Sequence, residues 1–169
     1  MLSQLQFEQW VPFPIEQVFL FFANPQNLPR IMPPDTATRL VELRLVAPAG
    51  RPADAAALAG VGSQIVTSFR LSPYLFARAE WIAEITEFEW NHHFADEQRR
   101  GPFRSFRHRH EFGNESRDGM AGTLVRDVIA YEVGFGLLGT LADKLFVRRQ
   151  MERVFLYRQQ ALEDLLAEA

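Results

Sequence analysis

Alternation of apolar and polar residues from about residue 38 to residue 133 is the feature that most constrains the fold. Successive side chains of a strand point to opposite faces, so a period of two predicts strands with one buried face. The alternation occurs in six successive segments, which are 41–45, 64–71, 78–90, 91–98, 103–113 and 122–133. With a further extended segment at residues 4–11, they predict an antiparallel sheet of about seven strands. In the first of the six, Val41, Leu43 and Leu45 are expected to face the core.

Helical spacing appears on both sides of this region. Ile15, Val18 and Phe19 share one helical face and predict a short helix that follows the first strand. A second short helix is expected over 25–31. From about residue 137 to residue 167 the chain has no proline and carries an apolar stripe at helical spacing. The stripe predicts one terminal helix, about 42 Å long at 1.5 Å per residue.

Composition narrows the class of protein. The 169 residues include no cysteine and carry a formal net charge of -3. A chain without cysteine has no disulfide, no Cys-ligated zinc or iron–sulfur cluster and no thiol nucleophile. No stretch resembles a signal peptide or approaches the ~20 apolar residues that span a bilayer. We therefore expect one domain, 1–169, located in the cytoplasm without stable membrane insertion, as a monomer or weak homodimer.

Two segments are interpreted as structural. The Ala-, Gly- and Pro-rich segment 47–62 predicts a mobile loop. Arginines alternate with phenylalanines between residues 99 and 109, but acidic residues lie among them and the overall charge is negative. This pattern favours a solvated sheet face, so we expect no nucleic-acid partner.

Two strings carry a family resemblance. They are WIAEITEFEWNHHFADEQRRGPFRSFRHRHEF, residues 81–112, and GTLVRDVIAYEVGFGLLG, residues 122–139. With the order of elements, they resemble the SRPBCC superfamily of START and birch-allergen-like proteins, in its bacterial polyketide cyclase/dehydrase-like, ligand-binding branch. The resemblance implies an α+β helix-grip fold. In that fold a curved antiparallel sheet wraps around the long C-terminal helix, two short helices follow the first strand, and a ligand cavity lies between sheet and helix.

Strand parity selects polar side chains that face inward. His108 and His110 have the parity of Phe106, and Asp127 has the parity of Ile129. Tyr131 shares this parity with Asp127 and Ile129 and faces inward with them.

A third strand contributes further inward groups, since His92 and Asp96 have the parity of Phe94. The segments 91–98 and 103–113 are joined by a hairpin around Gly101. If this hairpin pairs residues whose numbers sum to about 202, His92 lies opposite His110. Phe94 then lies opposite His108. A sum of about 235 in the next hairpin places His108 opposite Asp127, with Cβ atoms ~5 Å apart.

The hairpin itself carries the string DEQRRGP at residues 96–102. Gly-Pro sets a turn, and we favour a structural role in which Asp96 or Gln98 contacts Arg104 across it. A ligand contact at the cavity rim is the alternative.

These observations predict a domain that binds a hydrophobic or amphipathic small molecule, lipid- or polyketide-like, between the sheet and the terminal helix. The expected apolar wall consists of Phe7, Phe69, Trp81, Phe94, Phe106 and Ile129, and the expected polar contacts are His92, Asp96, His108, His110, Asp127 and Tyr131.

Three alternatives stay open. In a cyclase/dehydratase-type enzyme, His108 held by Asp127 would abstract a proton alpha to a carbonyl, and Tyr131 would donate to the enolate oxygen. In a protein-interaction module the cavity would serve no ligand. A metal held by His108, His110 and His92 is the weakest alternative, and we expect no metal and no other cofactor.

Overall fold

A seven-stranded antiparallel sheet forms the frame of the molecule. The computed structural model describes residues 2–50, 58–70, 78–134 and 146–168. In these residues the strand order is β1-β7-β6-β5-β4-β3-β2, with each strand antiparallel to its neighbours. The bounds are β1 (Ser3–Val11), β2 (Arg39–Arg44), β3 (Gln64–Arg70), β4 (Arg78–Glu89), β5 (His93–Arg100), β6 (Ser105–Arg117) and β7 (Met120–Glu132). The predicted strand count and curved helix-grip architecture are confirmed.

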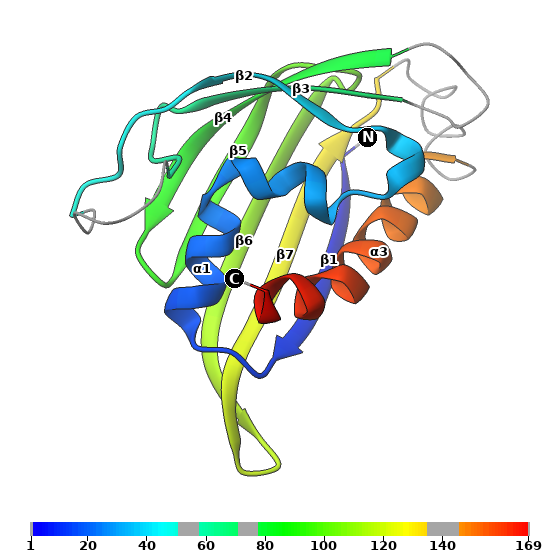
Figure 1. Cartoon of the computed structure of the whole chain (residues 1–169). Coiled ribbons are helices and arrows are strands. Elements are labelled where there is room, and N and C mark those ends of the chain that lie inside the picture. Colours follow the sequence, from blue (N-terminus) through cyan, green and yellow to red (C-terminus); the bar gives the residue numbers. More distant parts are fainter. Residues whose placement is uncertain (1, 51–57, 71–77, 135–145, 169) are drawn as a thin grey trace.

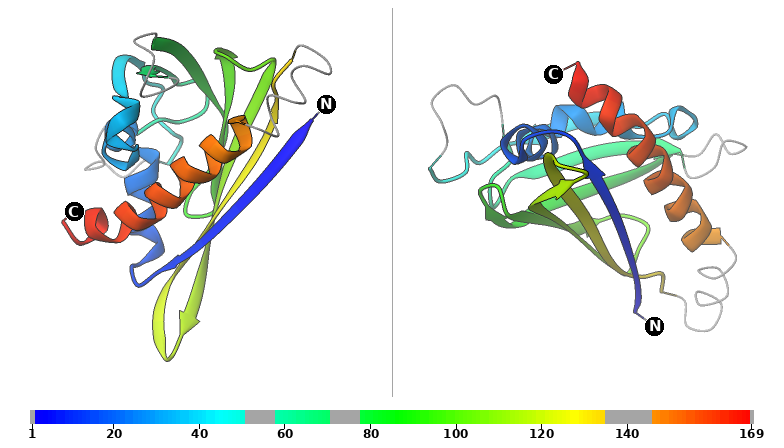
Figure 2. Two further views of the ribbon diagram at one scale, coloured as in Figure 1. Left: turned by 90° about the vertical axis from the view of Figure 1, so that its right-hand side faces the viewer. Right: turned by 90° about the horizontal axis from the view of Figure 1, so that it is seen from below.

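The helices cover one face of this sheet, as Figures 1 and 2 show. After β1 come α1 (Ile15–Ala23), the 3-10 helix η1 (Pro25–Ile31) and the 3-10 turn η2 (Pro34–Thr36), and α3 (Arg148–Ala167) closes the chain. The two short helices expected after the first strand are therefore present. The expected start of the terminal helix at about residue 137 lies outside the described residues. Within the described ranges, no helix is long and apolar enough to cross a membrane.

The core lies between the helices and the concave face of the sheet. Phe19 of α1 is completely buried, and its ring meets those of Phe88, Phe94 and Phe112 at centroid distances of 5.3, 5.9 and 5.1 Å. A second apolar cluster lies beneath α3, where Phe155 packs with other buried side chains, Leu5, Ile129 and Tyr131. Burial of this apolar area at roughly 25 cal/mol per Å² is what fixes the helices to the sheet.

In β2 the predicted orientation of one side chain is wrong, because Val41 does not face the core. A bulge between Leu40 and Glu42 shifts the pairing of β2 with β3. An extra residue in one strand reverses the alternation at that point. Leu40 and Leu43 therefore pack against the core, while Val41 is 59% exposed.

The segment 47–62, interpreted as a mobile loop, is anchored near its C-terminal end. Leu58 and Ala59 are buried, and the Ala59 backbone N–H donates to the carbonyl of Ala23 at 3.0 Å. A Cβ atom at Gly60 would lie 2.6 Å from the backbone of Pro48, so this close approach requires glycine. Residues 58–60 thus belong to the packed structure, and residues 51–57 lie outside the described part of the chain.

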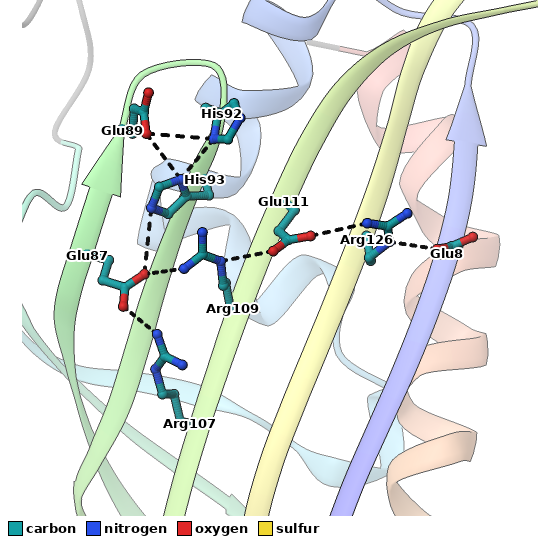
Figure 3. Close-up of polar contacts among 9 residues, drawn as sticks. All are labelled: Glu8, Glu87, Glu89, His92, His93, Arg107, Arg109, Glu111 and Arg126. Atoms are coloured by element: carbon teal, nitrogen blue, oxygen red, sulfur yellow. Dashed lines mark hydrogen bonds and ion pairs between the residues drawn. The ribbon is translucent and has the colours of Figure 1, made fainter.

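The opposite face of the sheet carries a row of charged side chains (Figure 3). Arg109 contacts Glu87 at 2.6 Å and Glu111 at 3.0 Å, and Arg126 contacts Glu111 at 3.4 Å and Glu8 at 2.6 Å. Arg109 of β6 is thus paired with carboxylates of β4 and β6, and Arg126 of β7 with carboxylates of β6 and β1, which fits the expected solvated sheet face.

Candidate functional site

A cavity of about 560 Å³ lies between the concave face of the sheet, η1 and α3. Small-molecule sites have volumes of roughly 300–1,000 Å³ and mainly apolar walls, and this cavity fits both descriptions. The apolar side chains on its wall include Phe22, Phe69, Trp81, Ile85, Phe94, Phe103, Phe106, Met151, Val154 and Phe155.

Aromatic rings dominate one end of this wall. The Trp81 ring of β4 meets Phe106 of β6 edge to face at a centroid distance of 4.6 Å, and Phe103 at 5.6 Å. Edge-to-face aromatic pairs prefer fixed orientations, so the rings form a shaped apolar surface.

The hairpin between β5 and β6 places Phe103 at the wall. The Gln98 side-chain amide donates to the carbonyl of Phe103 at 2.7 Å, and its oxygen accepts from the Phe103 N–H at 3.3 Å. A Cβ atom at Gly101 would lie 2.3 Å from that oxygen, so glycine is needed for the bridge to form. Gln98 thus holds the hairpin through the backbone of Phe103, and the predicted contact with Arg104 is not the one that forms.

Polar side chains from three strands and α3 meet at the cavity; they are Asp96, His108, His110, Asp127 and Arg158, and we call them the polar cluster. His108 Nε2 lies 2.8 Å from Asp127 Oδ1 in a hydrogen bond. His110 Nδ1 lies 2.7 Å from the same oxygen, although not aligned as a hydrogen bond. His108, His110 and Asp127 are all less than 9% exposed, and both imidazoles line the cavity with Asp127 behind them.

The strand registers that bring these residues together are shifted by two residues from the predicted registers. His110 lies opposite Asp127, and His108 lies opposite Asp96. His108 therefore reaches Asp127 diagonally along the sheet. A shift of two keeps each side chain on its face, which is why the inward direction holds while the partners change.

Asp96 and Arg158 complete the polar cluster on the cavity side. Asp96 Oδ1 lies 4.0 Å from His108 Nδ1. Arg158 projects from α3 with its guanidinium 4.8 Å from the centre of the Phe155 ring, and its buried Nε has no hydrogen-bond partner among the described residues. Arg158 was not among the residues selected from the sequence, although a charged residue within the apolar stripe of the terminal helix is a signal for it.

Burial sets the protonation of the polar cluster. Burial lowers the pKa of His108 to about 4, more than the attraction of Asp127 raises it, and also lowers the pKa of His110. Burial alone would raise the pKa of Asp127, but its contacts with the two imidazoles hold it well below its ordinary value. Both histidines are therefore neutral near pH 7, and Asp127 is an anion. Burial raises the pKa of Asp96, opposed by His108 and Arg158.

Five of the expected site residues do not line the cavity, and one of them, Asp127, lies behind the two imidazoles. His92 lies in the β4–β5 turn with 66% of its side chain exposed, so its predicted inward direction is wrong. The turn residue Asn91 has a φ of 57°, and β5 begins only at His93. Ile129 and Tyr131 are completely buried in the core beneath α3, and Phe7 stacks on Phe155 at 4.5 Å.

The fold resembles solved structures that share little sequence with this chain. TTHA0849 from Thermus thermophilus aligns with a TM-score of 0.66 and 18% identity over 98% of both chains. Ara h 8.0201 aligns with a TM-score of 0.65 and 12% identity over 100% of both chains. Norcoclaurine synthase from Thalictrum flavum aligns with a TM-score of 0.63 and 13% identity over 99% of this chain and 88% of its own. No curated protein sequence matches the chain significantly.

Similarity at this level shows a shared fold, and family membership comes from the sequence itself. Residues 11–158 match the family described as polyketide cyclase / dehydrase and lipid transport. The matched segment extends from the end of β1 into α3 and contains the whole polar cluster. The chain therefore belongs to the polyketide cyclase / dehydrase and lipid transport family.

Proposed function

We propose that this protein binds a hydrophobic or amphipathic small molecule in the cavity between the sheet and α3. The observation that carries the proposal is a cavity of about 560 Å³ with an aromatic wall and one polar cluster. Such a site would hold the apolar part of a ligand by area burial and would orient it through a few polar contacts.

The polar cluster supports a ligand that carries an oxygen function. Arg158 has a buried Nε–H without a partner among the described residues, and an unsatisfied buried donor costs about 1–3 kcal/mol. A carbonyl or hydroxyl oxygen of the ligand would accept from it. The apolar remainder would lie against Trp81 and Phe106. Among the structures of similar fold, norcoclaurine synthase has been solved with dopamine and hydroxybenzaldehyde, which are small aromatic molecules with oxygen groups.

A neutral fluorescent probe, N-phenyl-1-naphthylamine, tests the proposal. We expect one probe molecule to bind per chain with a rise in its emission and quenching of Trp81. Ala83 lines the cavity, so Ala83→Phe would fill part of it and weaken binding by about tenfold or more. Ala121→Phe is the matched control, because Ala121 is exposed at the far end of β7.

Equal probe affinity in the wild type and in Ala83→Phe, or no saturable binding at all, would overturn the proposal. Native mass spectrometry of the freshly purified protein is the complementary measurement. A bound lipid- or polyketide-like molecule that is present in the wild type and reduced in Ala83→Phe would identify the natural ligand class.

Acid–base catalysis is a second candidate, favoured by the 2.8 Å contact of His108 with Asp127 on the cavity side. A carboxylate that fixes the imidazole tautomer is the usual arrangement for a general base. Two observations weaken it: the pKa of His108 is lowered to about 4, and Tyr131 lies in the core instead of on the cavity wall. For any substrate that is turned over, His108→Gln should lower kcat by about a hundredfold, and an unchanged kcat removes this candidate.

A further inference from the structure

We infer that Asp96, His108 and His110 form a binding site for one divalent transition-metal ion on the floor of the cavity. The three side chains each offer a ligand atom, and these atoms all lie within 4.8 Å of one another. This site is independent of the proposed apolar ligand, whose binding can be measured in the presence of a chelator. In the metal alternative considered from the sequence the third ligand was His92, whereas the structure brings Asp96 close to His108 and His110.

The backbone fixes the spacing of these ligand atoms. Asp96 on β5 is paired directly with His108 on β6, and His110 follows two residues later on the same face. Ligand atoms about 2.0–2.2 Å from one ion lie about 3–3.5 Å apart when adjacent. The observed 4.0 Å between His108 Nδ1 and Asp96 Oδ1 needs only a small side-chain rotation to reach that range.

Asp127 contacts the two imidazoles on their side away from the cavity and favours the tautomers that metal binding needs. Its Oδ1 accepts a hydrogen bond from His108 Nε2 at 2.8 Å, which leaves the lone pair of His108 on Nδ1, toward Asp96. His110 Nδ1 lies 2.7 Å from the same oxygen but is not aligned as a hydrogen bond, and a small ring rotation would let Nδ1–H donate to it and leave Nε2 as the metal ligand. Histidines that bind metals almost always donate their other N–H to a carboxylate or carbonyl, as His108 does here.

The facing groups are two hydrogen-bond acceptors with space for a proton or a cation between them. An imidazole lone pair and a carboxylate oxygen are both acceptors, and among the described residues none donates a hydrogen bond between them. Either a proton on Asp96 or a metal ion satisfies both. When Asp96 is ionised, the two carboxylates Asp96 and Asp127 also outweigh the single positive charge of Arg158 in the polar cluster.

The ligand set indicates the class of metal and its exposure. Two imidazoles and one carboxylate suit Zn²⁺, Fe²⁺ or Co²⁺. Three protein ligands leave at least one coordination position open. That position would face the cavity, because all three side chains line it. A bound metal would thus present a Lewis acid to an oxygen atom of a cavity ligand.

The exposed group Glu89, His92 and His93 at the β4–β5 turn provides the matched control, since it also offers three ligand atoms within 4.8 Å of one another. Unlike the cavity site, it lacks a buried carboxylate behind its imidazoles. A His92→Asn/His93→Asn variant removes this surface group and leaves the cavity untouched.

The test is a titration of tag-free, chelator-treated protein with Co²⁺, followed by calorimetry and by visible absorption, with Zn²⁺ as competitor. We expect one Co²⁺ per chain with micromolar or tighter affinity and displacement by Zn²⁺. Asp96→Asn, which keeps the shape of the side chain, should weaken binding by about tenfold or more. The His92→Asn/His93→Asn variant should bind Co²⁺ like the wild type.

Absence of saturable Co²⁺ binding by the wild-type protein would overturn the inference. So would binding that survives in Asp96→Asn and is lost in the surface variant, because the ion would then lie at the turn. Circular dichroism and urea denaturation in EDTA, measured on the same Asp96→Asn sample, show that the variant is folded. Binding of N-phenyl-1-naphthylamine by the wild type in EDTA separates failure of the metal site from failure of the proposed ligand binding.

Discussion

Asp127 sets the properties of both buried histidines, because a single oxygen of its carboxylate lies against both imidazoles. Asp127→Asn removes a charge-assisted hydrogen bond and should lower the free energy of unfolding by about 1.5–3 kcal/mol. Urea denaturation at pH 7 measures this loss. The control is Glu111→Gln on the exposed face of β6, whose ion pairs should contribute less than about 1 kcal/mol. Equal effects of the two substitutions would contradict the prediction.

The lowered pKa of His108 predicts a pH dependence of stability. Between the unfolded value of about 6.5 and the folded value of about 4, the unfolded chain binds a proton that the folded chain does not. The free energy of unfolding should therefore fall as the pH decreases through this window, by at most about 1.4 kcal/mol per pH unit from this residue. Asp96, with a raised pKa, acts in the opposite direction, so the comparison must isolate His108.

Urea denaturation in EDTA at about pH 7, 6 and 5 provides that comparison, because these settings extend into the window. The wild type should lose stability with decreasing pH more steeply than His108→Gln. Parallel slopes for the two proteins would show that His108 titrates normally in the folded state.

Strand parity was sufficient to predict that His108, His110 and Asp127 lie on the same inward face. Their cross-strand pairing was predicted wrongly, because the centre of the turn was assumed at the wrong residues. Asp118 and Gly119 both have positive φ, 50° and 79°, and form a two-residue turn between the paired residues Arg117 and Met120. Asp-Gly is a preferred sequence for this turn. Centring the hairpin on this dipeptide would have placed His110 opposite Asp127.

Helix α3 is held to the sheet through Phe155. This ring stacks on Phe7 at 4.5 Å, meets the His108 ring edge to face at 5.4 Å and carries the Arg158 guanidinium at 4.8 Å. Phe155→Ala should lower the free energy of unfolding by about 3–5 kcal/mol. Leu156→Ala, one residue further along the helix and 56% exposed, should change it by less than about 1 kcal/mol. Comparable losses in urea denaturation would show that the helix is not anchored at Phe155.

The elements could be predicted from periodicity to the extent that they are regular. The alternation of β3 to β7 and the apolar stripe of α3 were sufficient for type and order. Irregularities were not predictable, because the bulge between Leu40 and Glu42 reverses which side chains face the core without leaving a mark in the order of apolar and polar residues. The inward position of Arg158 was missed because a charged residue of a helix ordinarily faces solvent, although this one occupies the apolar stripe.

The helix-grip fold could be predicted from the sequence, but the size of the cavity could not. β4 pairs with β5 through register shifts at Ile82/Ala83 and Ile85/Glu87. Such irregularities bend a strand, and Ala83 and Ile85 both line the cavity. The curvature that creates the space therefore depends on pairing details that a period of two does not specify.

Occupation of the cavity should stabilise the whole molecule. A ligand that binds only the folded state at a hundred times its Kd raises the free energy of unfolding by about 2.7 kcal/mol. N-phenyl-1-naphthylamine should therefore raise the Tm of the wild type and of Ala121→Phe in thermal denaturation. Ala83→Phe should show a much smaller increase, and an equal increase in all three proteins would place the probe outside the cavity.

The bulge in β2 has a consequence for association between molecules. The strand order leaves β1 and β2 at the two edges of the sheet, and an edge strand with regular unpaired N–H and C=O groups is a template for another chain. The irregular backbone at Leu40 and Glu42 interrupts that template. Deletion of Val41 should restore a regular edge and make the folded protein prone to sheet-to-sheet oligomers. Static light scattering at rising protein concentration would detect them, and a deletion variant that stays at the wild-type mass would show that the bulge does not protect this edge.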